Sequence, residues 1–123
     1  MIATKEAHIL TVDDNPVNLF LINTIVKKIL PDAQIYQAKS GTEALEIYNT
    51  NTLHLIFMDI KLPDLNGYEV IQLIRKAEQE ERTPIIVVSA NNSSDPQQAH
   101  LIDGYLEKPI KYDALESILA EKL

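Results

Sequence analysis

Three carboxylates, one hydroxyl and one ammonium follow short runs of strand-forming residues in the sequence: Asp13, Asp14, Asp59, Ser89 and Lys108. Carboxylates that lie close together raise one another's pKa unless a positive charge compensates them. A hard divalent cation such as Mg²⁺ supplies that charge and binds oxygen ligands. Aspartate is also a covalent nucleophile toward phosphoryl groups. Gathered in one place, these side chains would suit metal-assisted phosphoryl transfer.

Each of these residues also has an ordinary structural interpretation. Asp13 or Asp14 could cap the helix that Pro16 opens, and an aspartate at position 59 could serve only in a turn. Ser89 alone carries little information, and a lysine before a proline is commonly a solvated surface residue. The joint placement of all five residues at predicted strand ends is what favours a common site.

The elements that must position these residues are short strands alternating with helices. The predicted strands are His8–Val12, Ala33–Ala38, Leu55–Met58, Pro84–Ser89 and Gly104–Glu107. Helices are predicted from Pro16 to the stop at Pro31, over Gly41–Tyr48, from the Asn66 cap to Ala77, from about Pro96 to Leu101, and over Asp113–Lys122. This alternation predicts an α/β fold with a doubly wound, five-stranded parallel sheet and helices on both faces. The site of such a sheet lies beyond the carboxyl ends of its strands.

Helical spacing of apolar residues predicts which helix faces are buried. In the first helix, the residues that recur at this spacing are Phe20, Leu21, Ile25, Ile29 and their neighbours.

Length and composition limit the possible functions. The 123 residues fit one domain, 1–123, without a separate effector. Eleven basic and eighteen acidic residues give a net charge of −7, which opposes binding to nucleic acid or an anionic membrane. The chain has no cysteine, which excludes a thiolate zinc site and cysteine catalysis. No apolar stretch approaches the roughly 18 residues of a membrane span, so we expect a cytoplasmic protein without membrane insertion.

Four motifs at the predicted strand ends resemble those of the receiver domains of two-component response regulators. They are Val12-Asp13-Asp14-Asn15, the stretch from Met58-Asp59 to Asn66-Gly67, Val88-Ser89-Ala90, and Tyr105-Leu106-Glu107-Lys108-Pro109. The resemblance extends from about His8 to the C-terminus. It implies a flavodoxin-like sheet with strand order 2-1-3-4-5.

The same resemblance assigns roles to the site residues. It implies that Asp59 is the phosphoacceptor. Asp14, Asp59 and the backbone carbonyl of Lys61 would bind Mg²⁺, or Mn²⁺ in its place, and Asp13 would reach the metal through water. Lys108 would pair first with Asp59 and then with the phosphoryl group.

Further roles implied by the resemblance concern switching and lifetime. Ser89 would donate its hydroxyl to a phosphoryl oxygen, and Tyr105 would turn inward as Ser89 moves. Lys61 and Asn91 occupy positions that tune how long the phosphoryl group lasts, and a lysine at position 61 suggests slow hydrolysis. The Lys108-Pro109 peptide bond is expected to be cis.

The sequence departs from the family pattern in two respects. Ser89 stands where threonine is commoner, but both supply a hydroxyl, so we expect no loss of function. The interval from Ser89 to Lys108 is shorter than usual by about one helical turn. The missing residues fall in the fourth helix, which we expect to be short, shifted or mobile. The usual output face of the family is therefore in doubt.

The expected partner is a histidine kinase or a histidine phosphotransfer protein, which would donate the phosphoryl group. Docking is expected on the first helix and across the site from it, at Asn15, Pro16, Asn18, Pro109 and Ile110. The chain would relay the phosphoryl group or bind a target, either as a stand-alone protein or as a segment of a hybrid kinase. Its oligomeric state stays open.

Two alternatives belong to other classes of function. One is a binding module that works without phosphorylation. The other is a small magnesium phosphatase with an aspartyl-phosphate intermediate. Such a phosphatase needs a second acid two residues after the nucleophile, where this sequence has Lys61. We therefore expect self-catalysed phosphoryl transfer and not a turnover enzyme.

Overall fold

Five parallel strands form one sheet in the order β2-β1-β3-β4-β5. The computed structural model describes residues 7–79, 81–90 and 96–123. The strands are β1 (His8–Val12), β2 (Gln34–Ala38), β3 (Leu55–Asp59), β4 (Ile85–Ser89) and β5 (Gly104–Glu107). The predicted fold class and strand order are confirmed, and the predicted strand limits differ by at most one residue.

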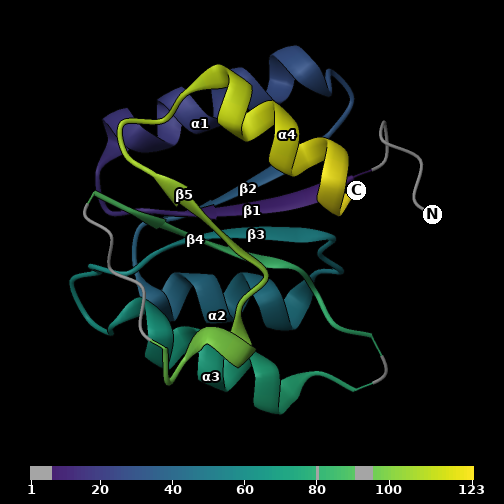
Figure 1. Ribbon diagram of the computed structural model, residues 1–123. Coiled ribbons are helices and arrows are strands. Elements are labelled where there is room, and N and C mark those ends of the chain that lie inside the picture. Colours follow the sequence, from purple (N-terminus) through teal and green to yellow (C-terminus); the bar gives the residue numbers. More distant parts are fainter. Residues whose placement is uncertain (1–6, 80, 91–95) are drawn as a thin grey trace.

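Helices cover both faces of the sheet, with α1 and α4 on one side and α2 and α3 on the other (Figure 1). They are α1 (Pro16–Ile29), α2 (Gly41–Thr50), α3 (Gly67–Ala77) and α4 (Tyr112–Lys122). In the part of the chain that is described, no helix is both long enough and apolar enough to cross a bilayer.

The central strand β3 is buried on both faces because the two helical layers pack against it. Its residues alternate between the layers, as the two-residue period of a strand requires. Leu55 and Phe57 join the core cluster under α1 and α4, whereas Ile56 and Met58 join the cluster over α2 and α3. The strand therefore carries Asp59 out of the middle of the core to the edge of the sheet.

Each of the first three helices begins at a polar side chain that accepts a backbone hydrogen bond. Asn15 accepts from Val17 N at 2.9 Å, with Pro16 as the first helical residue. Ser40 accepts from Glu43 N at 3.1 Å. These caps satisfy amide groups that have no partner inside the helix. They fix where the chain turns from each strand end into the next helix.

Only part of the apolar pattern of α1 is buried. The residues of α1 that are buried are Leu19, Ile22, Ile25 and Val26. Phe20 is 73% exposed, and Leu21 is also exposed. Helix α1 has a second apolar stripe at the spacing i, i+3, i+4, formed by Val17, Phe20 and Leu21, and this stripe faces solvent. We call it the outer stripe of α1.

The predicted fourth helix is reduced to one 3₁₀ turn, η2 (Ala99–Leu101). The described part of the chain thus has four α-helices and this turn, instead of five helices. The polar stretch 91–95, which was expected to precede it, lies outside the described residues. Because this turn is too short to supply the amide partners of a longer helix, the carbonyls of His100 and Leu101 accept hydrogen bonds from arginine side chains instead.

Two arginines bind the segment around η2. The Arg75 guanidinium, on α3, donates to Leu101 O at 2.8 Å and to Asp103 Oδ2 at 2.9 Å. Arg82 donates to Asp103 Oδ1 at 3.0 Å and to His100 O at 3.1 Å. The short segment before β5 is therefore attached to α3 by charge-assisted hydrogen bonds.

Candidate functional site

The carboxyl ends of β1, β3, β4 and β5 meet at one edge of the sheet. A pocket of about 260 Å³ lies there. The residues that line it include all five chemically active side chains of the sequence analysis, together with Asn15, Asn18, Ile60, Lys61 and Ala90. The fold thus brings the predicted site residues together, because a parallel sheet puts all strand ends of one sense on the same side.

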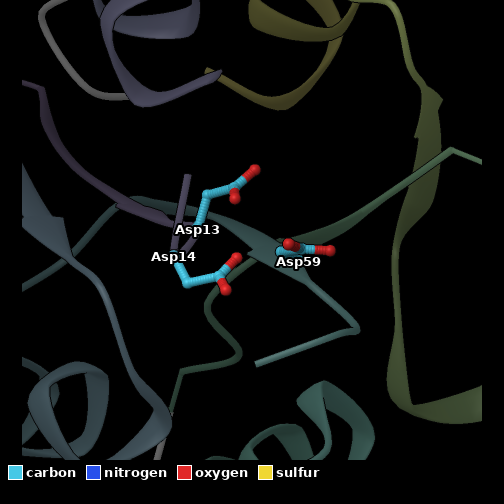
Figure 2. A group of neighbouring side chains, drawn as sticks. All are labelled: Asp13, Asp14 and Asp59. Atoms are coloured by element: carbon cyan, nitrogen blue, oxygen red, sulfur yellow. The ribbon is translucent and has the colours of Figure 1, made fainter. Parts of the chain in front are cut away.

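Asp13 and Asp14 follow β1, and Asp59 ends the neighbouring strand β3 (Figure 2). Oxygen atoms from the three carboxylates all lie within 4.8 Å of one another. Asp13 is 1% exposed and Asp59 is 5% exposed, whereas Asp14 is open to solvent. Two of the three negative charges are therefore largely removed from water.

Lys108 is the cation that pairs with this acidic group. Its Nζ lies 3.0 Å from Asp13 Oδ2 and 3.3 Å from Asp59 Oδ2. The expected pairing with Asp59 is present, and Asp13 lies closer still. Burial alone would lower the pKa of Lys108, but the two carboxylates raise it above its ordinary value. The ammonium is therefore charged at neutral pH.

The environment of Asp59 disfavours its ionised form. Burial is the main cause that raises the pKa of Asp59, and the charge of Asp13 adds to it. Lys108 and the backbone amide of Lys61, 3.2 Å from Asp59 Oδ1, oppose this effect without cancelling it. The single ammonium of Lys108 therefore leaves part of the negative charge uncompensated.

The donor set fits a hard divalent cation. Asp13 Oδ2 is buried and has no well-directed hydrogen bond, although it lies within ion-pair distance of Lys108. Asp13 Oδ1 accepts from Asn15 N at 2.9 Å. Carboxylate oxygens with few hydrogen bonds, an excess of negative charge and an open side toward water suit Mg²⁺. The acidic cluster of Asp13, Asp14 and Asp59 is thus a suitable metal site.

The residues predicted to switch or to set the lifetime lie around this pocket. Ser89 is half-buried and lines it, as does Lys61, whose side chain is exposed. Tyr105 is 44% exposed and does not line the pocket. Asn91 lies outside the described residues. The Lys108-Pro109 peptide bond is cis, as expected.

The residues predicted for partner docking divide into two groups. Asn15 and Asn18 line the pocket, and Pro16 and Pro109 are exposed near it. Ile110 is only 8% exposed and packs in the core, so it offers little surface to a partner. Val17 and Phe20, which are exposed and three residues apart on α1, were not among the residues predicted for docking.

Comparison with known proteins gives one consistent family. The model of the response regulator receiver domain matches residues 9–120. The chain is 32% identical over 114 residues to the signal transduction histidine-protein kinase BarA of Escherichia coli K12, a match covering 90% of the chain and 12% of that protein. It is 32% identical over 117 residues to stress response regulator protein 1 of Lodderomyces elongisporus, covering 91% of the chain and 32% of that protein. The chain thus spans a third or less of these two relatives.

Solved structures of receiver domains share the fold over nearly the whole chain. A receiver domain from Methylobacillus flagellatus has a TM-score of 0.88 at 28% identity, covering 96% of this chain and 99% of that one. The receiver domain of the Pseudomonas aeruginosa histidine kinase PA1611, with magnesium in its active-site cleft, has a TM-score of 0.83 at 30% identity, covering 95% and 97%. A chain of the Saccharomyces cerevisiae complex between the phosphotransfer protein Ypd1 and the Ssk1 receiver domain has a TM-score of 0.82 at 32% identity, covering 95% and 88%.

Removing the charge of Asp59 should stabilise the fold in metal-free buffer. A carboxyl whose pKa is raised on folding binds its proton more tightly in the folded state, so its contribution to stability falls as pH rises through that pKa. We expect Asp59→Asn to raise the urea midpoint at pH 7 with an unchanged slope. The difference in urea midpoint between Asp59→Asn and the parent chain should decrease as the pH is lowered toward the ordinary aspartate pKa.

The control for this experiment is Asp113→Asn, since Asp113 is an exposed aspartate in the first turn of α4. It should lower the midpoint at pH 7 slightly, because an acid in the first turn interacts favourably with the positive end of the helix dipole. An Asp59→Asn variant that unfolds at the same or a lower urea concentration than the parent would contradict the electrostatic account.

Proposed function

Because the chain belongs to the family of response regulator receiver domains, we propose that Asp59 accepts a phosphoryl group from a phosphohistidine of a partner protein. The observation that carries this proposal is the position of Asp59, buried at the end of β3 beside two further carboxylates and Lys108. A nucleophile among groups that bind a metal and a phosphoryl group fits phosphoryl transfer, which depends mainly on positioning and charge neutralisation.

In the transfer, a carboxylate oxygen of Asp59 attacks the phosphorus atom. A P–O bond forms, the P–N bond to the partner's histidine breaks, and the histidine nitrogen leaves with the bonding electron pair. The backbone amide of Lys61 orients the nucleophile by donating to Asp59 Oδ1 at 3.2 Å. The Lys108 ammonium lies 3.3 Å from Asp59 Oδ2 before the transfer. After the transfer it would form its ion pair with the phosphoryl oxygens.

The acidic cluster would also bind the metal ion that assists the transfer. Asp13, Asp14, Asp59 and the backbone carbonyl of Lys61 would hold Mg²⁺, which supplies positive charge to the phosphoryl oxygens when it is bound. The Ser89 hydroxyl, at the end of β4, would donate to one of these oxygens. Tyr105 pairs with Val87 in the register of β4 and β5, and its exposed ring would turn inward as Ser89 moves.

The outer stripe of α1 supports a docking face for a histidine-bearing helix of the partner. Val17 is 70% exposed and Phe20 is 73% exposed, and both belong to the helix that Asn15 caps at the pocket. Neighbouring exposed apolar side chains that are rimmed by polar ones commonly mark an interaction site. Asn15, Asn18, Pro16 and Pro109 would complete the face, with Ile110 supporting Pro109 from the core.

The partner is proposed to be a histidine kinase or a histidine phosphotransfer protein. BarA is a histidine kinase, and the structural relative from Saccharomyces cerevisiae was crystallised with the phosphotransfer protein Ypd1. The chain would relay the phosphoryl group onward or change its protein contacts when phosphorylated.

Incubation with acetyl phosphate and Mg²⁺ should add one phosphoryl group to the chain, measured by intact mass. The adduct should require the metal and be absent from Asp59→Asn, because that variant lacks the nucleophile. Trapping with beryllofluoride covers the case of rapid hydrolysis. If the parent chain forms neither adduct, the proposal fails, and a binding module that works without phosphorylation is favoured. Continued release of phosphate from an ester would instead favour the phosphatase.

The phosphoryl group on Asp59 should be long-lived, because the exposed side chain of Lys61 lines the pocket and can obstruct an attacking water. After removal of the donor, we expect Lys61→Ala to shorten the half-life of the adduct severalfold. A parent half-life of seconds that is unchanged in Lys61→Ala would reject this role for Lys61.

Phe20→Ala should weaken binding of a histidine phosphotransfer protein by about tenfold or more, since a large exposed aromatic side chain is a common hot spot. Asn18→Arg should slow transfer to Asp59 by steric conflict at the same face. Leu73→Ala is the matched control, because Leu73 is an exposed apolar residue on α3, beyond the opposite face of the sheet. Equal effects of Phe20→Ala and Leu73→Ala, measured by titration calorimetry, would exclude α1 as the docking face.

A further inference from the structure

The loop that follows Asp59 folds back on itself before α3 begins. Gly67 N donates to Ile60 O at 2.8 Å, and Lys61 pairs with Asn66 in an isolated antiparallel bridge. Within this loop, Lys61 N donates to Asp59 Oδ1 at 3.2 Å. The position of the loop therefore determines where the backbone of Lys61 lies relative to the nucleophile.

The tip of this loop is attached to the first turn of α2 by one carboxylate. Asp64 Oδ1 accepts from Gly41 N at 2.8 Å, and Asp64 Oδ2 accepts from Thr42 N at 2.9 Å and from Thr42 Oγ1 at 2.6 Å. The Thr42 hydroxyl and the two amides hold the pKa of Asp64 far below its usual range. The charged form of Asp64 is thus the one that binds α2.

Apolar side chains also pack closely between the loop and the first residue of α2, Gly41. A Cβ atom added to Gly41 would lie 2.8 Å from Val70 Cγ2 and 3.0 Å from Leu65 Cβ. Such distances are too short for a side chain at position 41. Because glycine has no side chain, Leu65, the neighbour of Asp64, packs directly against the backbone of α2.

The same end of α2 is connected to the other half of the acidic cluster. Asp13 N donates to Ala38 O, the last residue of β2, at 3.0 Å. Between Ala38 and α2, Lys39 N donates to Glu43 Oε1 at 3.0 Å. The segment 38–43 thus contacts the backbone of Asp13 at one end and the side chain of Asp64 at the other.

We propose that Asp64 is a positioning residue for the metal and phosphoryl site. By holding the loop against α2, it fixes the Asp59–Lys61 half of the site relative to the Asp13–Asp14 half. Mg²⁺ accepts little deviation from octahedral geometry, so a displaced loop weakens its binding. This inference rests on the proposed function of Asp59 and adds a residue outside the pocket that sets the metal affinity.

The test compares Asp64→Asn with Thr42→Ala, which removes one of the hydrogen bonds. Mg²⁺ alone is titrated into each protein, and binding is followed by nuclear magnetic resonance without any phosphodonor. We expect Asp64→Asn to raise the half-saturating Mg²⁺ concentration about tenfold, which is the low end of what is lost when groups that orient metal ligands are replaced. Thr42→Ala should raise it less. At low Mg²⁺ concentration, acetyl phosphate should phosphorylate Asp64→Asn more slowly than the parent chain. At high Mg²⁺ concentration, the two rates should become equal.

Asp113→Asn is the matched control, with the same loss of charge at an exposed aspartate in the first turn of α4. It should leave both the metal affinity and the rate unchanged. A merely structural cap would lower the unfolding midpoint of Asp64→Asn without moving the half-saturating Mg²⁺ concentration of the folded protein. That result overturns the proposal. If Asp64→Asn does not fold, an unchanged affinity in Thr42→Ala overturns it equally.

The two hypotheses fail in different ways. If the parent chain binds Mg²⁺ with the predicted dependence on Asp64 but gains no phosphoryl group, the positioning role stands and the phosphoacceptor function fails. If the parent chain takes a phosphoryl group on Asp59 and Asp64→Asn matches it at every Mg²⁺ concentration, the function stands and the positioning role fails. If the parent chain binds no Mg²⁺, the positioning role is wrong.

Discussion

Three carboxylates repel one another at one edge of the sheet, and the rest of the structure must supply the stability that offsets this repulsion. Their oxygens lie within 4.8 Å of one another, and Lys108 contacts two of the groups. An arrangement of this kind opposes folding in the absence of a cation, since burial and like charge both raise the pKa of Asp59. The surrounding core of apolar strands must supply the stability that holds the charges together.

Much of the fold could be predicted from the sequence because its strands are short apolar runs and its helix starts carry Asn15, Ser40 and Asn66. The gathering of Asp13, Asp59 and Lys108 followed from the single rule that parallel strands end at one edge. The outer stripe of α1 could not be assigned so easily, since an apolar run around the helix leaves two faces to choose from. The role of Asp64 was beyond sequence reasoning, because its partners lie more than twenty residues away.

The region between β4 and β5 illustrates how a chain compensates for a shortened element. The sequence indicated that the fourth helix was short, but not what replaced its contacts. Arg75 and Arg82 both reach Asp103, and each also donates to a backbone carbonyl near η2. Arginine–carboxylate contacts are directional because the guanidinium group is planar and presents its donors in a fixed arrangement. They give this segment a defined position without the length that a helix needs.

Gly67 has a consequence for how residues of this protein are ranked by their tolerance to mutation. A Cβ atom at position 67 would collide with the backbone carbonyl of Asp59 and with Ile60 Cα, so no other amino acid fits without moving the backbone of Asp59. Position 67 then behaves in a substitution survey like a chemically active residue, although glycine has no functional group. Intolerance to substitution therefore marks the space around the acidic cluster as well as the side chains that are proposed to react.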